Sequence, residues 1–136
     1  MSNLEQTLSI IKPDVLERNL DDEIKQMFQN KGFNILKEKK IQLAKSEAEQ
    51  FYKVHETKPF YNDLCAYLSS GPIVVMILEK DNAVLANREL MGATNPKDAE
   101  DGTIRKKYGA SIDKNSVHGS DSVENAKMEI DFFFKD

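Results

Sequence analysis

His118 is the residue whose chemistry stands out, because it is one of only two histidines in the chain, with His55. It lies in the segment 115–121, directly before a predicted last helix, where free backbone N–H groups and the helix dipole favour an anion. Gly119 follows it and would let a ligand approach closely. The segment is therefore compatible with an anion site that includes an imidazole. Local context alone favours the alternative, a surface-loop histidine beside an ordinary helix cap.

Three cations and one hydroxyl could join such a site. Lys12 ends a predicted strand, Arg88 lies near the end of a predicted helix, Thr94 follows Gly92, and Arg105 lies in a long polar stretch. Each also has an ordinary interpretation as a solvated charge or a turn hydroxyl. Periodicity cannot show whether the four converge.

Several common catalytic devices are absent from the sequence. It contains no glycine-rich dinucleotide fingerprint, no phosphate-binding loop that ends in Gly-Lys-Ser/Thr, and no Gly-x-Ser-x-Gly elbow. Two histidines are too few for a histidine-rich zinc site. Cys65, the only cysteine, allows no internal disulfide or cysteine cluster, and we expect it to be a small core residue.

Composition limits the class of protein. The chain has 136 residues, 40% of them hydrophobic and 31% charged, and a net charge of −4. This balance is too apolar for a disordered chain, and the longest apolar run, 73–78, is too short to span a bilayer. A negative net charge argues against a general grip on nucleic acid. With no signal peptide in the first residues, we expect a cytoplasmic protein without membrane or nucleic-acid partners.

The elements that must position these residues follow from hydrophobic periodicity, caps and breakers. Ser46 and Glu49 form a predicted capping box, and Asp121 and Glu124 open the last helix. The long stretch 93–117 reads as an ordered loop with one helical turn, of a length that is usually functional. The expected strands are 7–12, 33–43, 73–78 and 132–134, and the expected helices begin near residues 19, 46, 60, 82 and 121.

This order reduces to a β-α-β-β-α-β frame. We therefore predict an α+β, ferredoxin-like sandwich, in which a four-stranded antiparallel sheet carries helices on one face and a long loop insertion. Without repeats or a linker, the chain 1–136 reads as a single domain. The fold class by itself implies no function.

Four collinear segments resemble nucleoside diphosphate kinases. They are 9–14 (SIIKPD), 92–96 (GATNP), 102–105 (GTIR) and 115–122 (NSVHGSDS), and the similarity extends from about Thr7 to Phe134. The resemblance implies an insertion-bearing ferredoxin-like fold. It also implies reversible, Mg²⁺-dependent transfer of a γ-phosphoryl group from a nucleoside triphosphate to a nucleoside diphosphate through a phosphohistidine, by a ping-pong mechanism.

The same resemblance implies roles for individual residues. His118 would be the nucleophile, Glu129 would bond its other ring nitrogen, and Ser120 would help to fix the site. Mg²⁺ would be bound by the nucleotide phosphates. Asp121 would contact the ion through water, and no residue would be a direct metal ligand. The implied nucleotide contacts are Lys12, Arg88, Thr94 and Arg105 on phosphates, Lys12 and Asn115 on the sugar, and Phe60 on the base.

Tyr52 matches an active-site tyrosine of the family, although packing on its helix would explain it equally well. Val15 and Asp22 depart from the family pattern outside the catalytic matches. The resemblance further implies a homo-oligomer, either a hexamer or a tetramer. The main alternative is a catalytically weak, nucleotide-binding regulatory protein on the same scaffold, and nucleic-acid binding by an oligomer surface is a third interpretation.

Overall fold

The computed structural model describes residues 4–53, 56–93, 95–109 and 117–134. His55, Thr94 and Asn115 lie outside these residues. Four strands form one antiparallel sheet in the order β2-β3-β1-β4. The strands are β1 (Leu4–Ile11), β2 (Asn34–Ile41), β3 (Ile73–Asp81) and β4 (Val117–Gly119).

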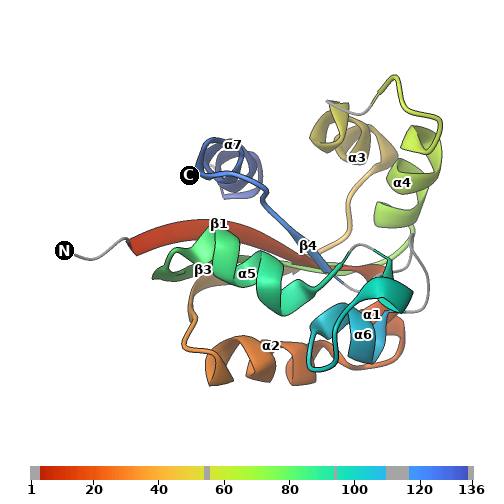
Figure 1. The fold of residues 1–136 in the computed structure, drawn as a ribbon. Coiled ribbons are helices and arrows are strands. Elements are labelled where there is room, and N and C mark those ends of the chain that lie inside the picture. Colours follow the sequence, from red (N-terminus) through yellow and green to blue (C-terminus); the bar gives the residue numbers. More distant parts are fainter. Residues whose placement is uncertain (1–3, 54–55, 94, 110–116, 135–136) are drawn as a thin grey trace.

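Helices fill the connections between the strands (Figure 1). None of those in the described ranges is long and apolar enough to cross a membrane. They are α1 (Pro13–Glu17), α2 (Asp21–Asn30), α3 (Lys45–Phe51), α4 (Tyr61–Leu68), α5 (Ala83–Met91), the 3₁₀ turn η2 (Pro96–Asp98), α6 (Ile104–Tyr108) and α7 (Val123–Phe133).

Helices cover both faces of the sheet, which corrects the prediction of helices on one face. In Figure 1, α3, α4 and α7 lie on one side of the sheet, and α1, α2 and α6 lie on the other. Alternate residues of β3 divide accordingly: Val75 packs with Cys65 and Phe133, whereas Met76 packs with Phe28 and Ile104. The apolar run of β3 has this cause, since a strand buried on both faces needs no polar positions. Cys65 is a buried core residue, as expected.

The predicted final strand at 132–134 is wrong, and the fourth strand is β4 instead. Helix α7 continues through Phe133 and places Ala126 and Phe133 in buried positions. A spacing of seven residues is two helical turns, so these side chains lie on one face, and packing overrides the β-propensity of the aromatic run. The short strand β4 was missed because three residues carry no measurable periodicity. As a result His118 lies on the sheet rather than in a loop.

Local boundaries also differ from the expected ones. Helix α3 begins at Lys45, and the Glu47 carboxylate accepts a hydrogen bond from the Ala44 N–H at 2.9 Å, so the predicted cap at Ser46 is wrong. Ser122, rather than Asp121, caps α7 by accepting from the N–H of Asn125. The long loop contains two short helical segments rather than one.

The two residues that depart from the family pattern, Val15 and Asp22, both lie in helices. Val15 lies in α1 and is fully buried in the core beside Phe28. Asp22 lies in the first turn of α2, where an acid favours the helix dipole, and its carboxylate is 4.0 Å from the ammonium of Lys25. Both residues support the helical layer beneath the sheet.

Candidate active site

His118 is positioned by the pairing of β4 with β1. It lies opposite Ile10 in the antiparallel register, and its side chain is 22% exposed. Successive residues of a strand point to opposite faces, so His118 and Gly119 face different helical layers. The imidazole is thus held on a rigid element and remains accessible from outside.

Glu129 of α7 fixes one nitrogen of this ring. The Glu129 Oε1 atom lies 3.1 Å from His118 Nε2, and the Ser120 hydroxyl donates to the same oxygen at 2.8 Å. Because a carboxylate only accepts hydrogen bonds, Nε2 donates this bond, and in the neutral ring Nδ1 then keeps its lone pair. The predicted set of His118, Glu129 and Ser120 therefore comes together in the structure.

Ser120 joins this set to the sheet. It is fully buried, its Oγ accepts from the Leu8 N–H at 3.2 Å, and its own N–H donates to the Leu8 carbonyl. The hydroxyl thus accepts from the backbone of β1 and donates to Glu129. This arrangement fixes the carboxylate relative to the sheet.

Helix α5 occupies the space beside Gly119, contrary to the expectation that a ligand would approach there. A Cβ atom at this position would overlap the Asn87 amide and would lie 2.7 Å from Met91 Cε. Glycine is required because helix and strand pack this closely. The ligand side of β4 must therefore be the face that bears His118 or the strand end.

Arg105 connects the long loop to the strand that carries the histidine. Its guanidinium donates to the Gly92 carbonyl at 3.0 Å and to the Val117 carbonyl at 2.9 Å. The side chain is buried, and its Nε has no hydrogen-bond partner among the residues that the structure describes. Burial, and then the positive charge of Arg88, lower the pKa of Arg105 to about 10. It remains a cation at neutral pH, in surroundings that favour an anion.

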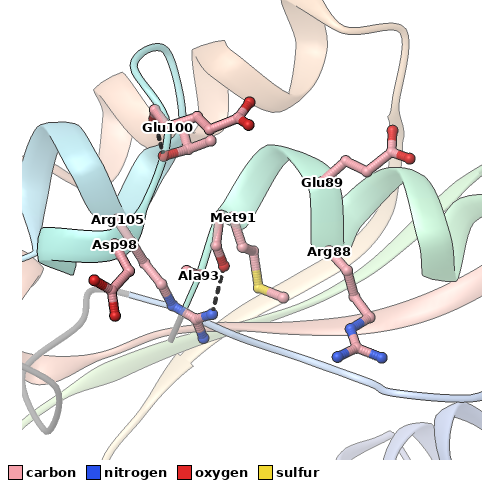
Figure 2. Close-up of a pocket in the computed structure, with 9 residues that line it drawn as sticks. Arg88, Glu89, Met91, Ala93, Asp98, Glu100 and Arg105 are labelled. Atoms are coloured by element: carbon pink, nitrogen blue, oxygen red, sulfur yellow. Dashed lines mark hydrogen bonds between the residues drawn. The ribbon is translucent and has the colours of Figure 1, made fainter. Parts of the chain in front are cut away.

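Arg88 and Arg105 line the same pocket, which has a volume of about 610 Å³ and lies between α5 and the long loop. Figure 2 shows both guanidinium groups on one side, with the Met91 thioether between them and the Asp98 carboxylate on the same side as Arg105, whereas Glu89 and Glu100 extend to the opposite side. Two neighbouring cations form a suitable environment for a polyanion. The structure thus brings together two of the predicted phosphate contacts.

Lys12, Tyr52 and Phe60 occupy three different places around this region. Lys12 directly follows Ile11, which pairs with Val117, so it lies at the β4 end of β1 and is buried. Tyr52 follows α3 and is buried, and its pKa is raised by that burial and, less strongly, by Cys65 and Glu129. Phe60 precedes α4 and is 44% exposed.

A polar network that the sequence did not reveal connects α1, α4 and α6. The Tyr67 hydroxyl accepts from the Asp14 N–H at 2.8 Å and donates to the Asp14 carboxylate. Arg18 bonds Asp14 and also the carbonyl of Tyr108. The i,i+4 spacing of Asp14 and Arg18 was the only available signal. The network fixes the segments that carry Lys12 and Arg105.

Comparisons with known proteins decide the family. A family model described as nucleoside diphosphate kinase matches residues 5–136. The chain is 56% identical to a nucleoside diphosphate kinase of Campylobacter jejuni (strain RM1221), over 97% of this chain and 96% of the relative. It is 53% identical to the Persephonella marina protein of the same name, over 97% and 94% of the two chains. The chain belongs to the nucleoside diphosphate kinase family.

Solved structures of nucleoside diphosphate kinases agree with this assignment. The Aquifex aeolicus enzyme superimposes with a TM-score of 0.95 at 37% identity, over 96% of this chain and 95% of that one. The Encephalitozoon cuniculi enzyme gives 0.94 at 38% identity, over 97% and 90%. The predicted ferredoxin-like fold of the nucleoside diphosphate kinases is confirmed, and the chain is a phosphotransferase that acts on nucleotides.

Proposed function

We propose that His118 is the nucleophile of this nucleoside diphosphate kinase. The observation that supports the proposal is the hydrogen bond from Nε2 to Glu129, because it leaves Nδ1 unprotonated for attack. Nδ1 would attack the γ-phosphorus of a nucleoside triphosphate, and the bond to the β–γ bridging oxygen would break. The diphosphate leaves with that electron pair, and the carboxylate stabilises the positive imidazole. A second diphosphate reverses the step, so one pocket serves both nucleotides.

Cations around the phosphates would supply the remaining catalysis, since phosphoryl transfer depends mainly on positioning and charge. We assign this role to Arg88 and Arg105, which share a pocket, and to Lys12 at the adjoining strand end. Ser120 would fix Glu129, and Tyr52 would act beside Glu129 from its position directly after α3. Thr94 and Asn115 keep their predicted contacts to phosphate and sugar, although both lie outside the described residues, and Phe60 would stack on the base.

Mg²⁺ fits this chain as an ion held mainly by the nucleotide. No group of three acidic, histidine or cysteine side chains in the described ranges could hold a metal. Phosphate oxygens and water are ligands that Mg²⁺ commonly uses. Asp121, between β4 and α7, would contact the ion through water. When bound, the ion neutralises charge on the β- and γ-phosphates.

We also propose the cytoplasm as compartment, a single domain over 1–136, and a homo-oligomer of four or six chains. The buried free thiol of Cys65 suits a reducing compartment. Strand β2 lies at the sheet edge with most of its residues exposed, so its backbone could pair with another copy. Light scattering after size-exclusion chromatography would give the number of chains.

A labelling experiment tests the nucleophile. The protein is incubated with γ-labelled ATP and Mg²⁺, and unlabelled GDP is then added. We expect acid-labile label on the protein that moves to GTP. His118→Asn should abolish labelling and retain nucleotide binding, whereas His55→Asn, the matched control at the other histidine, should label normally. Bound nucleotide without label on the unchanged protein would instead favour the regulatory alternative.

A further inference from the structure

We propose that Phe51, at the end of α3, is a positioning residue that restrains the His118 imidazole. The inference rests on the proposed role of His118 as nucleophile. The two rings lie in edge contact, with centroids 5.2 Å apart and planes at 77°. This is a favourable geometry for an aromatic pair. Phe51 thus contacts the reacting ring directly, although it has no place among the predicted site residues.

Three other aromatic side chains pack against the Phe51 ring. Its ring centroid lies 5.1 Å from that of Tyr52, 5.8 Å from Phe132 and 5.2 Å from Phe133. Phe133 is buried in the core on this side of the sheet, so α7 holds the cluster in place. A supported ring is a firm restraint, because close packing leaves it little freedom to move.

Two restraints then act on one imidazole. Glu129 bonds Nε2 and so selects the tautomer, but a single hydrogen bond lets the ring swing about that contact. The edge contact with Phe51 limits this swing. Phosphoryl transfer needs Nδ1 aligned with the γ-phosphorus, and small misplacements are costly. We therefore expect Phe51 to affect the chemical step and to leave nucleotide affinity unchanged, because its ring contacts His118.

Substitution of Phe51 tests the proposal. We expect Phe51→Leu to lower the rate of phosphoenzyme formation at saturating ATP about 5-fold, which corresponds to the usual worth of an aromatic pair. The dissociation constant of ADP should stay within about 2-fold of its original value. Phe51→Tyr keeps the ring and should restore the rate. In NMR spectra, the His118 ring signals should broaden in the leucine variant through exchange between orientations.

Phe132→Leu provides the matched control. Phe132 contacts Phe51 and Phe133, and no ring contact within the described residues joins it to His118. It should lose thermal stability as Phe51→Leu does but should slow phosphorylation clearly less, because Tyr52 and Phe133 still contact the Phe51 ring. Equal rates in the two leucine variants, or a loss that Phe51→Tyr does not restore, would overturn the inference. If the unchanged protein takes up no label, the proposed function itself fails, which is a different result.

Discussion

The two sides of the candidate site are built differently. On the histidine side, every named polar group has a partner within the chain: His118 bonds Glu129, Glu129 accepts from Ser120, and Ser120 bonds the Leu8 backbone. On the guanidinium side, Arg88 and Arg105 share a pocket, and within the described part of the chain the buried Nε of Arg105 has no acceptor. The comparison teaches that the imidazole proposed to react is held by partners within the chain, whereas the two guanidinium groups line a pocket in which a ligand can bind.

The largest expected effect is on the guanidinium side. Arg105→Leu removes a cation and two hydrogen bonds to carbonyls, so we expect kcat/KM for nucleotide to fall about 100-fold or more. Arg105→Lys should lose about 10-fold, because a compact ammonium keeps the charge but cannot span both carbonyls. Steady-state kinetics with ATP and a second diphosphate measures both. Equal activity of the leucine and lysine variants would show that charge is irrelevant here.

A smaller effect is expected at Glu129. Glu129→Gln keeps the size of the side chain but removes the charge that stabilises the imidazole, so phosphoenzyme formation should slow about 10- to 50-fold. Nucleotide affinity should stay the same, which separates this side of the site from the other. Glu124→Gln, on an exposed position of the same helix, is the control. A comparable loss in the control variant would contradict the assignment.

Arg18 tests whether the polar network positions the guanidinium side. Arg18→Ala removes the bonds to Asp14 and to the Tyr108 carbonyl, so the segment that carries Arg105 should become less ordered. We expect KM for nucleotide to rise about 3- to 5-fold with little change in kcat. Lys106→Ala, exposed on α6, should leave KM as it was. A fall in kcat alone would place Arg18 with the histidine side instead.

The smallest effect concerns pH. Burial lowers the pKa of Arg105 to about 10, so the free protein loses this cation as the pH rises through that value. A bound phosphate favours the charged form, and ADP affinity should therefore fall about 2-fold between pH 8 and pH 10. Titration calorimetry measures the change. The Arg105→Leu variant should not show this fall in ADP affinity. If its affinity falls with pH as that of the unchanged protein does, the assignment of the effect to Arg105 is wrong.

Long periodic elements were predictable from the sequence, and short ones were not. The apolar run 73–78, which lies in β3, was visible locally. Strand β4 was not, because it exists only through pairing with β1. The aromatic run at the carboxyl end of α7 favoured a strand until packing of Phe133 against the core decided otherwise.

The same division holds for the site. Motif similarity identified His118, Glu129 and Arg105, and their mutual geometry then appeared in the structure. Phe51 and Arg18 had no such signal, because an aromatic in a helix or an arginine after a short helix has many ordinary interpretations. Their contacts cross between elements far apart in the chain, and sequence spacing cannot report such contacts.

Strand β4 has only three residues and pairs with a single neighbour, β1. The rigidity of His118, the proposed nucleophile, therefore depends on β1, which is far from it in the sequence. Local opening of the pairing between β4 and β1, which amide hydrogen exchange would detect, would release the histidine while β1 and the helical layers remain intact. On warming, turnover should consequently be lost before the molecule as a whole melts, and a weakened pairing of β4 with β1 should widen that interval.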